Sequence, residues 1–251
     1  DLPETARSLV TRPRGMLLVT GPAGSGKSTT QAALIDKVNR EKSAHIMTIE
    51  DPIEFLHTDK KGIINQRQIG RDTLSFAIGL KYVLRQDPDL ILIGEMRDLE
   101  TISLAVTIAE TGHLLLGTLH TTDAAQTVDR VINAFPIHQQ QQTRMQLSVN
   151  LIGVISQLLL QKADGSGVIS AFEVMVVTTA IKNCIREGKT HQIPQVMQTG
   201  AEHGMISMER SLVKLVNSGV ITVDEALAKA PHPEALENLL PVTNKATSLA
   251  Y

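Results

Sequence analysis

Short apolar runs alternate with amphipathic segments over the first part of the chain. Four segments have the composition of short strands, at 15–20, 45–50, 90–93 and 114–119. Segments compatible with helices follow them, at about 27–40, 73–86, 99–110 and 123–134. The run at 90–93 is continuously apolar, as is typical of a strand buried on both faces. This alternation predicts an α/β fold with a mostly parallel sheet.

The pattern changes after Pro136. A long helix is predicted at about 138–155, and strands are predicted at about 156–162 and 168–177. Because the residues at 163–167 have the composition of a tight turn, these two strands should form a hairpin.

Beyond Thr178 the strand pattern disappears. Apolar residues instead share a helical face, at Met208, Leu212, Leu215 and Val216. Thr222 and Glu225 have the spacing of a capping box at the start of a helix. A boundary between an α/β region and a helical region is therefore expected near Thr178.

Composition limits the classes of partner. Apolar residues make up 42% of the 251 residues, so the chain can bury a sizeable core. Aromatic residues contribute only 2% and tryptophan is absent, so that core must be aliphatic. The net charge is −2, and the basic residues are dispersed along the chain. This offers neither a basic stripe for a phosphate backbone nor stacking platforms for single strands, so no nucleic-acid partner is expected.

Cysteine usage and hydropathy bear on the cellular compartment. The one cysteine, Cys184, excludes a disulfide framework and a thiolate zinc site, and it fits a reducing compartment. No apolar run approaches the roughly 18 residues of a membrane span, and no signal-peptide pattern is present. These features predict a cytoplasmic protein. Because the chain opens on Asp1 and soon reaches its first strand, we expect it to be a fragment.

Residues 21–28 satisfy the phosphate-binding pattern G-x-x-x-x-G-K-[ST] between a predicted strand and a predicted helix. Glycines let backbone amides turn toward phosphate oxygens, and the helix N-terminus adds partial positive charge. Lys27 should reach the β- and γ-phosphates of ATP, and the Ser28 hydroxyl should bind Mg²⁺. The alternative is a glycine-rich turn that carries a lysine by chance, but it would not explain why a predicted strand precedes the pattern and a predicted helix follows it. The predicted nucleotide-binding residues are Gly21, Pro22, Ala23, Gly24, Ser25, Gly26, Lys27, Ser28 and Thr29.

Hydrolysis also needs carboxylates that hold the metal shell and activate water. Glu95 follows the continuously apolar strand, and Glu50, Asp51 and Glu54 cluster after the second predicted strand. Both positions are candidates, because α/β sheets bind ligands beyond the ends of their strands. Acidic residues are also common at solvated strand ends, and this alternative stays open, more so for the cluster.

Two histidines bracket the strand predicted at 114–119. His120 could contact the γ-phosphate, although a lone histidine at a strand end is more often a structural hydrogen-bonding residue. His113 lies about 23 Å from His120 along an extended strand and on the opposite face, so the two are not a metal pair. Arg130 follows Asp129 on the next helix, where it could form a surface ion pair or reach a neighbouring subunit's nucleotide.

Together these motifs resemble those of a known family. Four segments are similar in order and spacing to the Walker A, Asp, atypical Walker B and His boxes of type II/IV secretion ATPases, at 21–28, 48–54, 94–98 and 110–121. The match is closest to the twitching-motility retraction ATPases of the PilT type, and it runs from about Leu2 to Ala230. The expected domains are a RecA-like P-loop ATPase domain at 14–177, a small helical C-terminal domain at 178–251 and a residual interdomain linker at 1–13.

The resemblance also implies roles for individual residues. Glu54 would polarise the attacking water, Glu95 would hold the water shell of Mg²⁺, and His120 would sense the nucleotide. Arg130 is similar to an arginine that family members present across a subunit interface. Such ATPases are homohexamers at the cytoplasmic face of the inner membrane, where they work with a platform protein and the pilin machinery. The expected cofactors are ATP and Mg²⁺.

Two departures from the family pattern concern the partners. The family's N-terminal PAS-like domain is absent from this chain, and with it the arginines that this domain would contribute. The segment 180–187 resembles a surface helix associated with retraction, but carries Lys182 and Cys184 in place of arginine and leucine. Lys182 keeps the charge without the planar guanidinium, and Cys184 is smaller but still apolar.

The sequence therefore predicts an ATP-hydrolysing motor subunit that powers type IV pilus retraction. An extension or type II secretion ATPase is the nearest alternative, but those enzymes carry a four-cysteine zinc insert and this chain has one cysteine. A non-hydrolysing regulator that binds ATP to hold a ring together is a second alternative, and Glu54 and Glu95 argue against it. A nucleic-acid translocase is disfavoured by the charge and the scarce aromatic residues.

Overall fold

A seven-stranded sheet organises the computed structural model, which describes residues 2–240. The strand order is β3-β2-β4-β5-β1-β6-β7, and neighbouring strands are parallel except β6 and β7. The strands are β1 (Gly15–Thr20), β2 (His45–Glu50), β3 (Ile63–Gln68), β4 (Leu90–Ile93), β5 (Leu114–Leu119), β6 (Leu151–Gln161) and β7 (Val168–Val176). The predicted α/β fold with a mostly parallel sheet is confirmed.

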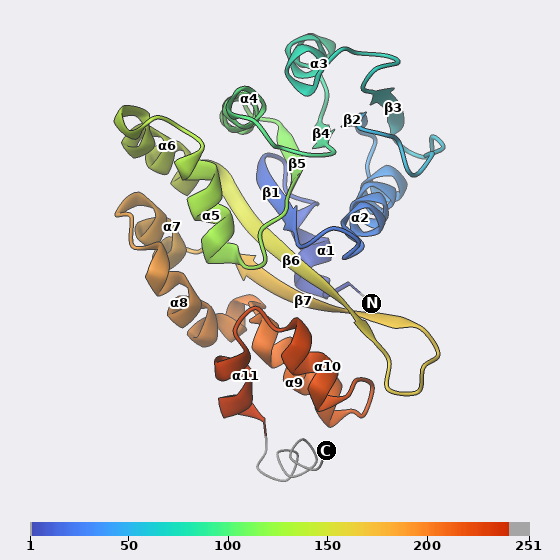
Figure 1. The fold of residues 1–251 in the computed structure, drawn as a ribbon. Helices are drawn as coiled ribbons and strands as arrows, with labels where there is room; N and C mark the ends of the chain where they lie inside the picture. Colours follow the sequence, from blue (N-terminus) through green and yellow to red (C-terminus); the bar gives the residue numbers. More distant parts are fainter. Residues whose placement is uncertain (1, 241–251) are drawn as a thin grey trace.

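Helices cover both faces of the sheet (Figure 1). The crossover from β1 to β2 and the crossover from β4 to β5 run in opposite directions along the strand order. Because such crossovers are right-handed, α2 and α4 lie on opposite faces. The helices are α1 (Glu4–Leu9), α2 (Lys27–Glu41), α3 (Phe76–Val83), α4 (Leu99–Glu110), α5 (Ala124–Asn133), α6 (Ile137–Asn150), α7 (Thr179–Arg186), α8 (Ile193–Thr199), α9 (Met208–Asn217), α10 (Val223–Lys229) and α11 (Pro233–Leu239), with 3₁₀ turns η1 (Leu84–Gln86), η2 (Thr190–Gln192) and η3 (Gly200–His203). Over residues 2–240, none of these helices has both the length and the apolar character needed to cross a membrane.

The core around the sheet is aliphatic, as the composition predicts. Every residue of β1, β4 and β5 is buried, including the continuously apolar run Leu90–Ile93. Burying a leucine or isoleucine side chain contributes about 1.5–3 kcal/mol, so these strands are held firmly. Their carboxyl ends, where ligands of α/β sheets bind, are thereby fixed in position.

One predicted boundary is wrong. Helix α6 ends at Asn150 and strand β6 begins at Leu151, whereas the sequence pattern predicts a helix to about 155. Residues 151–155 are all buried, and they pair in parallel with β1 from Met16 to Val19. A buried apolar run has no clear periodicity, so only the pairing with β1 decides that it is a strand.

Two features near the edge of the sheet also differ from the prediction. The pattern does not predict β3, because the residues after Ile64 are polar, yet β3 pairs in parallel with β2. The helix predicted at 73–86 is shorter: α3 begins after Ser75, whose hydroxyl accepts a hydrogen bond from Ile78 N, and the 3₁₀ turn η1 follows it. Backbone pairing therefore sets β3, and capping by Ser75 sets the start of α3.

The predicted hairpin is formed by β6 and β7, and the C-terminal helices α9, α10 and α11 lie beside it (Figure 1). A second core cluster joins Leu158 and Leu160 of the hairpin to Met208 and Leu212 of α9. This cluster anchors the C-terminal helices on the strands that continue the sheet.

The predicted capping box at α10 forms only in part. Thr222 Oγ1 accepts a hydrogen bond from Glu225 N at 3.1 Å, as a capping residue does. The Glu225 carboxylate, however, accepts from Gln161 N at 2.9 Å instead of returning to the backbone of Thr222. Glu225 therefore ties α10 to the end of β6.

Packing continues across both expected domain boundaries. Helix α1 buries Ala6 and Leu9 in the same core cluster as the sheet, so the segment expected as a linker contains a helix packed on that core. Ile181 of α7 and Ile193 of α8 belong to the same cluster. The division into 14–177 and 178–251 stays a prediction, and residues 1 and 241–251 of the expected domains lie outside the described residues.

Candidate functional site

The phosphate-binding loop lies where the pattern places it, between Thr20 at the end of β1 and Lys27 at the start of α2. Gly24 and Gly26 have φ angles of 74° and 89°, in the left-handed region that favours glycine. A Cβ atom at Gly26 would also come within 2.8 Å of Gln157 Nε2. Glycine at these positions lets the chain turn from a buried strand directly into a helix.

Lys27 is held at the mouth of this loop. Its ammonium group donates hydrogen bonds to the backbone oxygens of Gly21 and Pro22, at 2.8 and 2.9 Å. Burial lowers the pKa of Lys27 below its usual value, while the nearby carboxylates of Glu95 and Glu54 act in the opposite direction. A half-buried lysine therefore faces two acidic side chains.

Within the acidic cluster, Glu54 is the residue that reaches the loop. Ser28 Oγ donates to Glu54 Oε1 at 3.0 Å. Glu50 instead accepts hydrogen bonds from Thr48 Oγ1 at 2.7 Å and from Gln66 Nε2 at 3.1 Å, which tie it to β2 and β3. The structure thus separates one carboxylate beside the loop from one that supports the edge of the sheet.

Glu95 and His120 are brought together because they follow the neighbouring parallel strands β4 and β5. His120 Nε2–H donates to Glu95 Oε1 at 2.8 Å, and Arg97 forms an ion pair with the same oxygen. Burial raises the pKa of the Glu95 carboxyl, but the hydrogen bonds from Arg97 and His120 prevail and hold the pKa below its usual value. Glu95 is therefore an ionised carboxylate with two donors.

These side chains border one cavity of about 360 Å³. The cavity lies at the carboxyl ends of the parallel strands, where α/β sheets bind ligands. Its wall combines residues of the loop with residues at or after the strand ends, among them Ala23, Gly24, Gly26, Lys27, Ser28, Thr29, Glu50, Asp51, Glu54, Glu95 and His120. The P-loop and three of the four residues that the sequence analysis assigned to catalysis thus meet at one place.

Arg130 and His113 lie away from this cavity. Arg130 is exposed on α5, and its Nη2 donates to the backbone oxygen of Arg97 at 3.4 Å. Within residues 2–240 it makes no ion pair with Asp129, so the surface pair that the sequence left open does not form. His113 shares a hydrogen bond of 3.1 Å with Thr111 and has no part in the site.

Sequence reasoning did not assign a role to Gln157 or Arg97. Gln157, on β6, is buried, and its Oε1 accepts a hydrogen bond from Thr30 Oγ1 at 2.6 Å. A Cβ atom at Gly21 would lie 2.3 Å from the backbone oxygen of Gln157, so this strand supports the loop from behind. No local pattern indicates Gln157, because its partners are far away in the sequence. Arg97, by contrast, lies only two residues after Glu95, and this close spacing of opposite charges could have indicated the ion pair between them.

The groups around the loop fit a nucleotide phosphate and Mg²⁺. Ser25 Oγ is buried and has no hydrogen-bond partner among the described residues, so it can donate to a phosphate oxygen. Ser28, Glu54 and Glu95 present the hard oxygen atoms that Mg²⁺ prefers. Within residues 2–240, no group of three or more His, Cys, Asp or Glu side chains could itself hold a metal ion. Mg²⁺ in proteins is usually bound through one or two side chains together with water and substrate phosphates.

A parallel sheet whose first strand leads through a P-loop into a helix, with carboxylates after two adjacent strands, defines a RecA-like P-loop domain. The family described as "Type II/IV secretion system protein" matches residues 2–228, and the chain belongs to this family.

Three relatives carry the family resemblance further. The chain is 52% identical to the "Twitching motility protein" of Neisseria gonorrhoeae, over 93% of this chain and 63% of that protein. It is 54% identical to the "Type IV pilus retractation ATPase PilT" of Pseudomonas aeruginosa, over 88% of this chain and 64% of that protein. The solved structure described as "Crystal Structure of the Pilus Retraction Motor PilT and Bound ADP" is similar with a TM-score of 0.89 and 49% identity, over 94% of this chain and 67% of that one. The predicted resemblance to PilT-type proteins is confirmed, and the chain spans less than two thirds of the two curated relatives.

Proposed function

We propose that this chain is the ATP-hydrolysing part of a motor subunit that powers retraction of a type IV pilus. The observation that carries the proposal is the meeting of Lys27, Ser28 and Glu54 at one cavity, with Ser28 Oγ 3.0 Å from Glu54 Oε1. Two relatives described as a twitching motility protein and a pilus retraction ATPase support it, as does the ADP-bound solved relative. The test is phosphate release from ATP and Mg²⁺ by the complete protein, together with pilus-dependent motility of cells that produce it.

Binding of the triphosphate falls to the loop and to Lys27. The Lys27 ammonium now bonded to Gly21 and Pro22 is placed to exchange these neutral acceptors for charged phosphate oxygens. Ser28 Oγ would hold Mg²⁺, which when bound neutralises charge that develops on the phosphates. Ser25 Oγ adds one more buried donor.

Activation of water falls to Glu54. Phosphoryl transfer to water needs the water aligned with the γ-phosphate and a group that accepts its proton. Glu54 Oε1 already lies beside Ser28, so its carboxylate reaches the side of the loop where the terminal phosphate would be. Glu54 is the only member of the acidic cluster for which the described residues provide a hydrogen bond to the loop.

Glu95 and His120 form the second functional unit of the proposal. Glu95 is ionised and would accept hydrogen bonds from water around Mg²⁺, the role that its position after β4 favours. His120 donates to the same carboxylate oxygen at 2.8 Å. A change in the water shell of Mg²⁺ would therefore alter the hydrogen bond between His120 and Glu95, which suits a residue that senses the nucleotide.

Glu95→Gln should lower the rate of hydrolysis about 10- to 100-fold, the range typical for residues that support a metal ion. Part of the loss should be recovered at high Mg²⁺, because the amide weakens the metal shell without removing Ser28. Phosphate release measured against Mg²⁺ concentration tests this. Glu100→Gln is a matched control, since Glu100 forms an exposed ion pair with Lys81 at 2.7 Å and lies outside the cavity. A Glu95→Gln deficit that no Mg²⁺ concentration changes would contradict the metal-shell role.

Assembly and location complete the proposal. We expect the complete protein to form a homohexamer at the cytoplasmic face of the inner membrane, in contact with a platform protein and the pilin machinery. Arg130 is exposed and outside its own subunit's cavity, which leaves it available to a neighbouring subunit's nucleotide. Association of the chain with the membrane would then depend on these partners.

Helix α7 is the proposed contact for retraction partners. It buries Ile181, Cys184 and Ile185, so the cysteine that departs from the family pattern faces the core. Arg186 and Glu187 are exposed at its end. The charges proposed to contact a partner therefore lie on two exposed side chains, and replacing them should not disturb the packing of α7 against the core.

Replacing Arg186 and Glu187 together by alanine should leave ATP turnover within a few-fold of the parent and abolish motility in complemented cells. The reason is that both side chains are exposed and their contacts, to Asn183 and Lys189, lie at the same helix end. Phosphate release and twitching are measured on the same variant. Replacement of Glu202 and Arg210, two exposed charges elsewhere, is the control and should leave both unchanged. Loss of turnover together with motility would show that the helix end is structural.

Two alternatives give different outcomes. A non-hydrolysing regulator would bind ATP with no phosphate release, although Glu54 and Glu95 both border the cavity. An extension or type II secretion ATPase would hydrolyse ATP without supporting retraction, and the single cysteine of this chain does not fit the zinc insert of such enzymes.

A further inference from the structure

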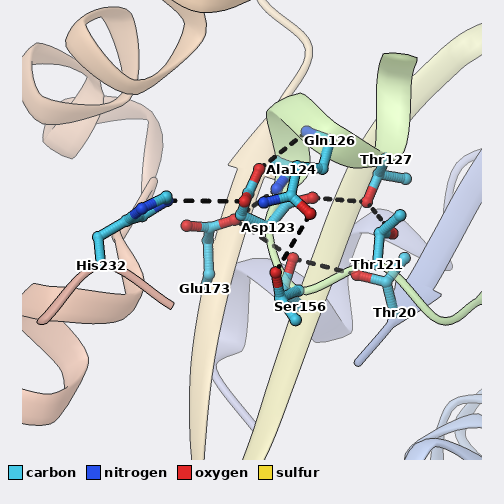
Figure 2. A network of polar contacts seen from close by, with 10 residues as sticks. Thr20, Thr121, Asp123, Ala124, Gln126, Thr127, Ser156, Glu173 and His232 are labelled. Atoms are coloured by element: carbon cyan, nitrogen blue, oxygen red, sulfur yellow. Dashed lines mark hydrogen bonds and ion pairs between the residues drawn. The ribbon is translucent and has the colours of Figure 1, made fainter. Parts of the chain in front are cut away.

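A buried polar network lies on the side of β6 facing away from the P-loop, and the roles above do not explain it. Its centre is Glu173 on β7, which is 6% exposed (Figure 2). The Glu173 carboxylate accepts hydrogen bonds from Ala124 N at 2.7 Å and from Ser156 Oγ at 3.2 Å. Ser156 and Gln157 are adjacent on β6, so their side chains point to opposite faces, one toward this network and one toward the loop.

One arm of the network ends at the root of the P-loop. Thr20 Oγ1 donates to Ser156 Oγ at 3.1 Å, and Ser156 Oγ in turn donates to Glu173. Thr20 is the last residue of β1 and directly precedes Gly21, and all three side chains of this arm are buried. A relay of two hydrogen bonds therefore links the strand end that presents the loop to the carboxylate.

The other arm ends in the segment that follows His120. Ala124 N, bonded to Glu173, opens helix α5. Thr127 Oγ1 donates to the backbone oxygen of Asp123 at 2.7 Å, and it shares a 2.6 Å hydrogen bond with Thr121 Oγ1. The carboxylate thus anchors a short, cross-linked turn that begins at the residue after His120.

The C-terminal helices close the network from the third side. His232, at the start of α11, lies 3.6 Å from Asp123 Oδ2, a buried atom that has no hydrogen-bond partner among residues 2–240. A small cavity of about 50 Å³ lies beside these side chains, and Glu209 of α9 borders it together with Asp123, Glu173 and His232. Figure 2 shows the imidazole of His232 pointing toward the side chain of Asp123, next to Glu173.

We propose that Glu173 is a positioning residue for ATP hydrolysis, which holds the strand end before the P-loop in register with the segment after His120. Hydrolysis requires the phosphates, held by the loop, and the groups after β4 and β5 to keep a geometry within a fraction of an ångström. Glu173 accepts directly from the segment after His120, through Ala124 N, and is linked to the strand end before the P-loop through Ser156 Oγ and Thr20 Oγ1, so one carboxylate joins the two segments. The inference rests on the proposed ATPase function.

The titration of Glu173 provides a signature by which the network can be followed in solution. Burial raises the pKa of Glu173 to about 7, Asp123 and Glu209 add to the rise, and the hydrogen bonds from Ala124 and Ser156 oppose it. The folded carboxyl therefore keeps its proton over a range, from its ordinary 4.5 to about 7, in which the unfolded one has released it. Its contribution to stability is complete at low pH and is lost as the pH rises through that range. His232 and Asp123 also face the group, and Glu173→Gln leaves both in place.

The test compares Glu173→Ala with Glu173→Gln in the complete protein. Glutamine keeps an oxygen that accepts from both donors, so its rate of hydrolysis should stay close to that of the parent. Alanine removes the acceptor, and its kcat should fall about 10- to 100-fold, as when a supporting hydrogen-bond partner is lost. Hydrogen exchange of amides 121–127 should accelerate in Glu173→Ala only. Glu209→Gln is the matched control, because Glu209 borders the network and makes no hydrogen bond to it.

Three results would overturn the inference. The first is a folded Glu173→Ala protein with the kcat and the exchange rates of the parent. The second is a Glu173→Gln protein as impaired as Glu173→Ala. The third concerns pH: between about pH 5 and about pH 8 the unfolding midpoint should fall more in the parent than in Glu173→Gln, and equal slopes would count against the proposal.

Should Glu173→Ala fail to fold, Ser156→Ala tests the arm to Thr20 alone. It should weaken the binding of a fluorescent ATP analogue and raise KM while leaving kcat near the parent's, and unchanged binding would overturn that arm. If the complete parent protein releases no phosphate from ATP, the proposed function fails. Analogue binding, hydrogen exchange and the pH slopes then still decide whether Glu173 holds the two segments.

Discussion

Glu54→Gln is expected to bind ATP and Mg²⁺ nearly as tightly as the parent protein and to release phosphate about 10²–10⁴-fold more slowly. Glutamine has the size of glutamate, and its Oε1 can still accept the hydrogen bond that Ser28 Oγ donates at 3.0 Å. The local geometry should therefore persist. The amide cannot take a proton from the attacking water, so the loss should appear in the hydrolytic step alone.

The acidic cluster provides its own control for this substitution. Glu50→Gln alters a carboxylate that borders the same cavity, but one whose hydrogen bonds go to Thr48 and Gln66 and not to the loop. It should keep most of the activity. Titration of a fluorescent ATP analogue and timed phosphate release, on the same preparations, separate affinity from rate. A Glu54→Gln protein with a rate near the parent's would show that Glu54 is not the base, and Glu95 would become the candidate.

Lys27→Ala is expected to lose affinity for ATP itself, by about 10- to 100-fold. A hydrogen bond between charged groups contributes about 1.5–3 kcal/mol, and no other cation of the described loop residues 21–28 could replace the ammonium group. The half-buried lysine faces Glu54 and Glu95, so its removal also takes away a positive charge that these carboxylates and the phosphates share. The loss should therefore appear in the affinity for ATP itself, whatever happens to the rate of the chemical step.

The matched control for Lys27 is Lys37 on the same helix. Lys37 pairs with Glu41 at 2.7 Å and does not border the cavity, so Lys37→Ala should bind the analogue as the parent does. Binding is measured by analogue titration with the same Mg²⁺ concentration throughout. Unchanged affinity in Lys27→Ala would mean that backbone amides of the loop hold the triphosphate alone.

The elements that could be predicted from sequence are those with a strong local pattern. β1, β2, β4 and β5 have the bounds expected of them, because each is a short apolar run closed by a polar or turn residue. The errors fall where local pattern is weak. β3 is mostly polar, and the start of β6 is apolar without periodicity, so pairing with neighbouring strands decided both.

The site shows the same division. The P-loop is local: its glycines, lysine and serine lie within eight residues, and the positive φ angles of Gly21, Gly24 and Gly26 follow from the residue type. The position of Glu54 beside Ser28, and the hydrogen bond from His120 to Glu95, join residues that lie far apart in the sequence. Sequence order places such residues at strand ends but does not say which of several carboxylates reaches the loop.

What the sequence by itself determined is the class of chemistry. The phosphate-binding pattern between a strand and a helix, and the carboxylates after two strands, needed only local geometry and residue type. The tertiary structure decided the partners: Glu54 and not Glu50 beside the loop, Gln157 behind it, and Glu173 between two distant segments. The physical reason is that a parallel sheet brings together strand ends that are distant along the chain, and such contacts leave no periodic or local trace in the sequence.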